Sequence, residues 1–96
     1  MKLSKQEFLS LAGMGHETLD AWIEAEWLIP GRSSLDLNFS DIDIARARLI
    51  RELQVDFGVN DEGVGVILNL VDQLHGMRRT LMELRQSVRP TPRIET

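Results

Sequence analysis

Residues 4–31, SKQEFLSLAGMGHETLDAWIEAEWLIPG, decide the fold. Ser4 and Glu7 have the spacing of a capping box, in which each side chain accepts a hydrogen bond from the other residue's backbone amide. A first helix is therefore expected to begin here, and Gly13 and Gly15 are expected to end it. Its apolar face consists of Phe8, Leu9 and Leu11.

A second helix is expected over residues 16–26, because Leu19, Trp22 and Ile23 recur at helical spacing. Two helices joined by a turn that contains glycine form a helix-turn-helix. The stripe makes Trp22 a core residue, whereas Trp27, at the end of the helix, should be partly exposed and available as a binding hot spot.

The segment of residues 29–39 predicts a small hairpin, or wing. Leu35, Leu37 and Phe39 alternate with polar residues, which is typical of a half-buried strand. The preceding residues 31–34, GRSS, are typical of a turn.

A third helix is expected to begin after the N-cap Ser40 and to end near Phe57 and Gly58. Its apolar stripe should consist of Ile42, Ala45, Leu49 and Leu53. Three arginines lie off this stripe, and we expect them to pair with nearby carboxylates or to stay solvated. The arginines are Arg46, Arg48 and Arg51, and the carboxylates are Asp41, Asp43 and Glu52.

The last helix should begin after the N-cap Asn60 and stop at Pro90 and Pro92. Its apolar residues follow at alternating spacings of three and four, the heptad pattern of a coiled coil. They are Ile67, Leu70, Leu74, Met77, Leu81, Leu84 and Val88. This stripe either packs back on the N-terminal part or pairs with a second chain. We favour a homodimer, since the N-terminal part is too small to cover a helix about 40 Å long. Parallel and antiparallel pairings both remain open.

The predicted fold class is all-α, in a single domain overall. Residues 1–58 form a winged helix-turn-helix part with a small β-wing, residues 59–89 a long dimerisation helix of coiled-coil type, and residues 90–96 a flexible tail.

The composition narrows the function. The chain has 96 residues, a net charge of −4 and no cysteine, which excludes disulfides and thiolate metal sites. An acidic chain favours a basic protein partner over nucleic acid, because proteins that bind nucleic acid carry a positively charged surface. No segment reaches the roughly 20 apolar residues of a membrane helix, and the N-terminus lacks a signal peptide. We expect a soluble, cytoplasmic protein without a membrane partner.

No arrangement of residues predicts catalysis, so we expect a protein that is not an enzyme and that needs no cofactor or metal. His16 and His75 are expected to be ordinary surface residues, without a carboxylate or histidine partner on the next turn of the helix. Gly63 and Gly65 follow no strand and do not form a phosphate-binding loop. Ser33 has no base nearby.

The succession of helix-turn-helix, wing, third helix and long helix resembles MerR-type regulators. The resemblance covers about the first 55 residues and lies in Thr18-Leu19, residues 28–32 (LIPGR), residues 39–43 (FSDID) and residues 48–53 (RLIREL). Taken alone, it implies a dimeric transcriptional regulator that binds DNA.

The positions that would contact DNA depart from that family. MerR-type regulators usually have an arginine directly after the Thr-Leu pair, where this chain has Asp20. Their wing usually carries a Tyr-Arg pair, and Asp36 and Leu37 stand at the aligned positions. A carboxylate in place of a guanidinium turns an attraction of order 1 kcal/mol into a comparable repulsion of phosphate. Glu17 and Glu24 reinforce this effect.

The whole chain is similar to bacterial chaperone modulators of the CbpM family, in residues 48–53 and in residues 59–74 (VNDEGVGVILNLVDQL). That resemblance implies binding to the J-domain of a DnaJ-like co-chaperone of the CbpA type. It also implies that the bound protein blocks, by occlusion, the stimulation of a DnaK-type chaperone.

A J-domain presents a basic helix, so its competitor should be acidic. Two surfaces compete for this role. The first is the second helix with Glu17, Asp20, Glu24, Glu26 and the anchor Trp27, and the other is the junction of the third and fourth helices with Asp56, Asp61 and Glu62. A DNA-binding regulator is the alternative, and a dimeric adaptor with some other partner is a third hypothesis.

Overall fold

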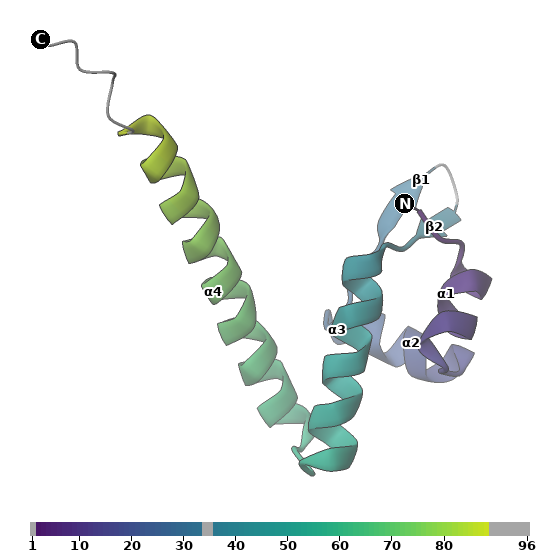
Figure 1. Cartoon of the computed structure of the whole chain (residues 1–96). Helices are drawn as coiled ribbons and strands as arrows, with labels where there is room; N and C mark the ends of the chain where they lie inside the picture. Colours follow the sequence, from purple (N-terminus) through teal and green to yellow (C-terminus); the bar gives the residue numbers. More distant parts are fainter. Residues whose placement is uncertain (1, 34–35, 89–96) are drawn as a thin grey trace, which may run out of the picture. The chain divides into compact units, whose positions relative to one another are not determined.

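The structure is a computed structural model that describes residues 2–33 and 36–88. Its elements are α1 (Lys5–Ala12), α2 (His16–Glu24), β1 (Gly31–Ser33), β2 (Asp36–Asn38), α3 (Asp41–Arg51), the π-helical turn η1 (Glu52–Asp56) and α4 (Asp61–Ser87) (Figure 1). The chain divides into two compact units, residues 1–65 and residues 66–96. The predicted fold class is confirmed, since helices dominate and the sheet is a two-stranded wing.

The capping box at the start of α1 is formed as predicted. Ser4 Oγ accepts a hydrogen bond from the Glu7 amide at 3.1 Å, and Glu7 Oε1 accepts one from the Ser4 amide at 2.8 Å. Gly13 ends the helix with a φ of 66°, a conformation that favours glycine. The predicted apolar face was wrong in one residue, because Leu11 is exposed and Ala12 is buried beside Phe8.

Helix α2 ends at Glu24, two residues earlier than predicted. Glu26 has a φ of 64°, and this conformation reverses the direction of the chain. The Trp27 amide then donates a hydrogen bond to the Trp22 carbonyl oxygen at 2.9 Å. The reversal carries Leu28 into the core, where it is fully buried. The predicted core position of Trp22 and the partial exposure of Trp27 are both confirmed.

The wing is an antiparallel hairpin in which Gly31 pairs with Asn38 and Arg32 with Leu37. The predicted turn was therefore wrong over residues 31–33, which form β1, because their backbone pairs with β2. Leu35 lies outside the described residues. Leu37 is half-buried and Phe39 buried, but Asn38 between them is half-buried as well, so the predicted alternation holds only in part.

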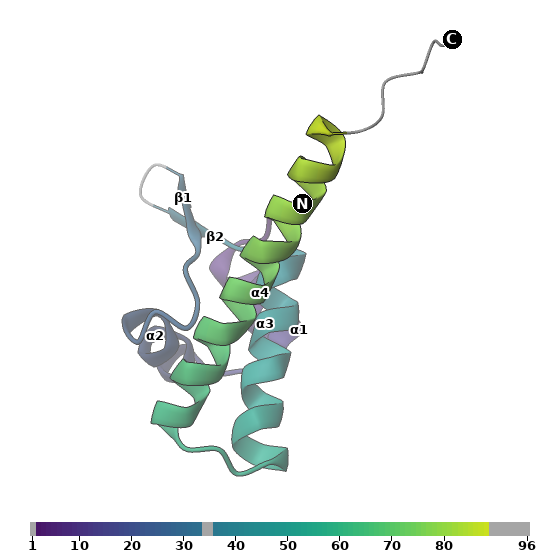
Figure 2. The same cartoon turned by 90° about the vertical axis from the view of Figure 1, so that its left-hand side faces the viewer.

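Helix α3 begins after Ser40, whose amide donates to Asp43 Oδ2 at 3.0 Å. The predicted stripe was wrong for Ile42 and Ala45, which are exposed, and only half right for Leu49 and Leu53, which are half-buried. The buried residues are instead Ala47 and Ile50. Helix α1 packs against α3 (Figures 1 and 2). Ile44, Ala47 and Ile50 form a second apolar series at a spacing of three, and this series is the one that the fold buries.

The third helix ends near Phe57 and Gly58 as predicted, but its last turn is π-helical. The Phe57 amide donates to the Glu52 carbonyl at 3.1 Å, five residues back, and Gly58 has a φ of 65°. A π-turn shifts the side chains that follow it around the helix axis, and such turns are frequent at functional sites.

The core of the first unit is built around two stacked phenylalanines. The Phe8 and Phe39 ring centroids lie 4.3 Å apart with the planes 18° from parallel. Phe39 is held there by a bridge to the N-terminal segment, in which the Leu3 amide donates to the Phe39 carbonyl at 2.7 Å and the Phe39 amide to the Leu3 carbonyl at 2.9 Å. The largest fully buried side chains are Phe8, Phe39, Leu19, Leu28, Ile50 and Val64.

Helix α4 begins after Asn60, whose Oδ1 accepts a hydrogen bond from the Gly63 amide at 2.8 Å, as the predicted N-cap requires. The prolines predicted to stop it, Pro90 and Pro92, and the tail of residues 90–96 lie outside the described residues. No helix among residues 2–33 and 36–88 is long and apolar enough to cross a membrane.

Candidate partner-binding surface

The first unit has a hollow of about 360 Å³ beside Trp27, which we call the Trp27 hollow. Helix α2, η1 and the first turn of α4 all contribute to its wall. The lining residues are Ala21, Trp22, Ala25, Trp27, Gln54, Asp61 and Glu62. The Trp22 and Trp27 ring centroids are 6.1 Å apart, and their planes are tilted by 47°.

Small residues and a chain reversal create this hollow. Ala21 and Ala25 are one helical turn apart, and their methyl groups leave the surface of α2 open. The positive φ of Glu26 then returns the chain so that Trp27 lies beside Trp22. Arg46 of α3 donates a hydrogen bond from Nε to the Trp27 carbonyl oxygen, which holds this backbone in place.

Two carboxylates lie at the start of α4 on the wall of the hollow. Asp61 and Glu62 are both exposed, and Gln54 Nε2 of η1 donates to Asp61 Oδ1 at 3.4 Å. Among the described residues that line the hollow there is no lysine or arginine. The Trp27 hollow thus combines aromatic walls with two exposed carboxylates.

The two surfaces that the sequence predicted as alternative binding sites for the partner meet at this hollow. Trp27 from the first and Asp61 and Glu62 from the other line it together. The remaining five predicted partner-binding residues lie outside the lining, and all are exposed. They are Glu17, Asp20, Glu24, Glu26 and Asp56.

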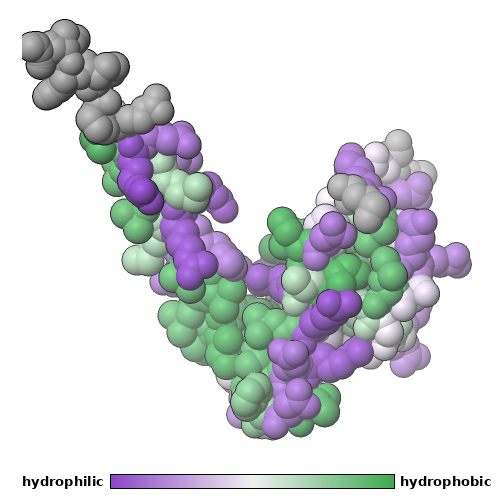
Figure 3. Space-filling model, viewed as in Figure 1, coloured by the Kyte–Doolittle hydropathy of each residue, from purple (hydrophilic) through white to green (hydrophobic). Residues whose placement is uncertain are grey.

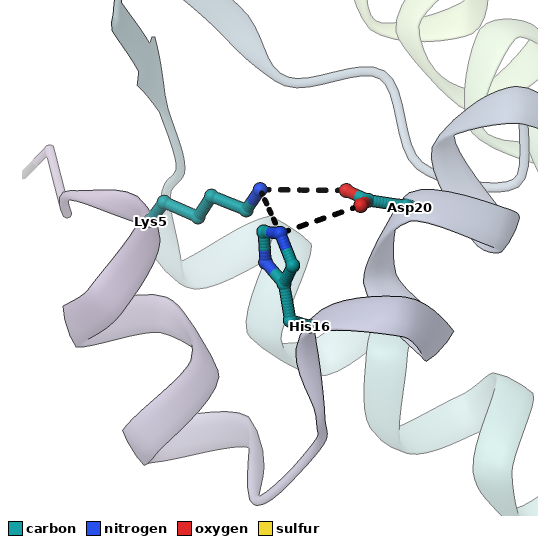
Figure 4. Close-up of polar contacts among 3 residues, drawn as sticks. All are labelled: Lys5, His16 and Asp20. Carbon is teal, nitrogen blue, oxygen red and sulfur yellow. Dashed lines mark hydrogen bonds and ion pairs between the residues drawn. The ribbon is translucent and has the colours of Figure 1, made fainter.

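The acidic face of α2 carries a partial counter-charge that sequence reasoning missed. Lys5 Nζ of α1 lies 3.4 Å from Asp20 Oδ1, and His16 Nε2 lies 3.5 Å from Asp20 Oδ2 (Figure 4). The expectation that His16 would meet no carboxylate on its helix was wrong, and the four-residue spacing of His16 and Asp20 was the available signal. Lys5 had no such signal, because the tertiary fold brings it there.

Two of the three arginines of α3 bind backbone carbonyls. Arg46 donates to Trp27, and Arg51 Nη2 donates to the Gly13 carbonyl oxygen at 2.9 Å. Arg51, which was expected to pair with a carboxylate or to stay solvated, is exposed and also binds this carbonyl at the end of α1. Arg48 is exposed.

The apolar stripe of α4 is a second candidate surface and belongs to the second unit. Leu70, Leu74, Met77, Leu81, Leu84 and Val88 are all exposed, and Ile67 is half-buried. Figure 3 shows hydrophobic side chains along one side of this helix and hydrophilic ones along the other. Pairing with a second chain stays a prediction.

Metal binding finds no support in the described residues. Within residues 2–33 and 36–88, no three histidine or acidic side chains lie close enough together to hold a metal ion. His75 is exposed on α4.

Comparison with known families gave a match over most of the chain. The family model described as MerR HTH family regulatory protein matches residues 3–86. No curated protein and no solved structure matched significantly.

Proposed function

Because the chain belongs to the MerR HTH family of regulatory proteins, we propose that it regulates by binding a protein through its acidic helix-turn-helix surface, without catalysis. The partner we propose is the J-domain of a DnaJ-like co-chaperone of the CbpA type, as the resemblance to CbpM-family modulators implies. By covering the basic helix of the J-domain, the bound chain stops it from stimulating a DnaK-type chaperone.

The observation that carries this proposal is the negative charge around the Trp27 hollow. Asp61 and Glu62 lie on its wall, and Glu17 and Glu24 are exposed on α2, which contains no lysine or arginine. A carboxylate repels a phosphate group by about 1 kcal/mol per close pair in water. This surface therefore opposes DNA and attracts a basic helix. Trp27 adds the aromatic contact typical of interface hot spots.

DNA binding is the second candidate, and family membership together with the wing favours it. Arg32 is exposed on β1, and Arg48 is exposed on α3, so both guanidinium groups could meet phosphates. Against it, the guanidinium groups of Arg46 and Arg51 already hold backbone carbonyls. The negative charge of α2 supports the protein partner over DNA.

We also propose that two copies pair through the apolar stripe of α4. Six of its seven residues are exposed, and leucines at this spacing are the pattern that coiled coils bury. Covering one leucine contributes about 1.5–3 kcal/mol. A dimer would present two acidic surfaces.

The test is a calorimetric titration of the full chain with the J-domain of a co-chaperone from the same cell, followed by measurement of the chaperone ATPase. We expect saturable binding that weakens with salt, and loss of J-domain stimulation as the chain is added. The variant Asp20→Lys/Glu24→Lys should bind about tenfold more weakly and with a flatter salt dependence. Glu83→Lys, on α4, is the control.

A gel-retardation assay at low salt separates the two candidates. A sequence-specific DNA shift together with no J-domain binding would reverse their order. Unchanged J-domain affinity in the charge-reversal variant would remove α2 from the interface.

A further inference from the structure

The Trp27 hollow is suited to one particular kind of side chain. It has aromatic rings on one part of its wall, alanine methyl groups beside them, and the carboxylates of Asp61 and Glu62. We infer that this hollow receives a single cationic side chain of the partner, an arginine in preference to a lysine. The inference relies on the proposed function for its partner, and the hollow is also tested below without that partner.

Charge complementarity selects a cation over an apolar anchor. An apolar side chain seated here would remove water from Asp61 and Glu62 without replacing its hydrogen bonds, which is unfavourable. A cation replaces that water with charge-assisted hydrogen bonds. Its methylene stem can at the same time cover Ala21 and Ala25 on the surface of α2.

Arginine fits the wall better than lysine does. A guanidinium group stacks on an indole face and presents a planar fork to carboxylates, whereas an ammonium group is a strongly hydrated point charge. Both tryptophans line the hollow, with ring centroids 6.1 Å apart.

The local structure prepares the site before a partner arrives. Gln54 Nε2 in η1 donates to Asp61 Oδ1 at 3.4 Å, and Asn60 caps α4 through the Gly63 amide. These hydrogen bonds restrain the first turn of α4, which carries both carboxylates. Arg46 holds the Trp27 carbonyl. Groups held in position lose less entropy when they bind, which favours a small cationic ligand.

The test uses N-acetyl-arginine methylamide as the probe and its citrulline analogue as the matched control, since citrulline has the same shape without the charge. The chain contains only two tryptophans, so the indole N–H signal of Trp27 can be followed by nuclear magnetic resonance and assigned with Trp27→Phe. We expect the arginine probe to shift this signal saturably at millimolar concentration, and the citrulline probe to bind at least about fivefold more weakly.

Matched variants locate the charge that matters. Glu62→Gln should weaken arginine binding about threefold to tenfold, whereas Glu83→Gln, an equal charge change on an exposed residue of α4 outside the hollow, should leave it unchanged. Both residues are exposed, and circular dichroism checks that both variants fold. Equal binding of the two probes, stronger binding of an N-acetyl-norleucine probe, equal effects of the two variants, or no shift of the Trp27 signal would each overturn the inference.

A second arm separates this inference from the proposed function. Each lysine and arginine of the J-domain's basic helix is replaced by glutamine, and each variant is titrated against the wild-type chain and against Glu62→Gln. One position should lose about tenfold in affinity against the wild type and clearly less against Glu62→Gln. If the arginine probe binds but the J-domain does not, the hollow is a cation receptor for another partner. If the J-domain binds, but no lysine or arginine position shows an affinity loss that depends on Glu62, the inferred cation site is refuted and the proposed function stands.

Discussion

Lys5 on α1 and Asp20 on α2 form an ion pair with an Nζ–Oδ1 distance of 3.4 Å. The pair joins the two helices of the helix-turn-helix and partly neutralises a carboxylate at the centre of the acidic face of α2. We therefore expect Asp20 to contribute less than Glu24 to the proposed partner binding, since Glu24 is exposed two turns from the helix start.

The first prediction concerns this ion pair. Lys5→Met should change the free energy of unfolding by less than about 1 kcal/mol, because exposed ion pairs contribute little. It should tighten binding of a basic partner about twofold, since it releases the Asp20 carboxylate. Lys2→Met, which removes the same charge from an exposed residue, is the control in calorimetry. Equal tightening by both variants would show that only net charge matters.

The second prediction concerns the apolar stripe of α4. Leu81→Glu should raise the dimer dissociation constant by about tenfold or more, because each copy of the dimer loses an apolar contact and buries a charge. Sedimentation equilibrium over a range of concentrations measures this constant. Gln86→Glu, five residues further on an exposed position off the stripe, should leave it unchanged. A wild-type chain that stays monomeric at high concentration would contradict the proposed pairing.

The third prediction concerns the chain reversal at Glu26. A residue with a Cβ pays roughly 1–2 kcal/mol for the left-handed conformation, and glycine does not. Glu26→Gly, at a φ of 64°, should therefore stabilise the chain by up to about 1 kcal/mol, after the added entropy of the unfolded state is subtracted. Urea unfolding at one fixed chain concentration measures the change.

Gly58 allows the opposite substitution, in which a residue with a positive φ gains a Cβ atom instead of losing one. It has a φ of 65°, and an added Cβ would meet no atom within 4 Å. Gly58→Ala should thus cost about 1 kcal/mol from backbone strain alone. A loss of stability in Glu26→Gly would mean that the carboxylate has a compensating contact.

The fourth prediction concerns the stacked rings of Phe8 and Phe39. Phe39→Ala should lower the free energy of unfolding by about 3–5 kcal/mol, because it leaves a cavity in a fully buried position against the second ring. Ile42→Ala is the control, since Ile42 is 77% exposed and its truncation should cost less than about 0.5 kcal/mol. Comparable losses in the two variants would contradict the assignment of the core.

The local signals of this sequence determined where α1, α3 and α4 begin and where α1 ends. The capping box at Ser4, the N-caps Ser40 and Asn60 and the glycine at position 13 act through hydrogen bonds and backbone angles within a few residues, so their effect does not depend on the rest of the chain. The same locality explains why the helix-turn-helix, the wing and the long last helix were all predictable.

The tertiary structure decided which faces of those elements are buried and which charges meet. The apolar stripe of α3 was misplaced because the buried residues are Ala47 and Ile50, and helical spacing alone does not say which apolar series a neighbouring element will cover. The ion pair between Lys5 and Asp20 could not be predicted for the same reason, since the two residues are fifteen residues apart along the chain. The acidic residues and Trp27 could be named from the sequence, but a shared hollow required the reversal at Glu26 and the π-turn before α4, which bring three separate segments to one place.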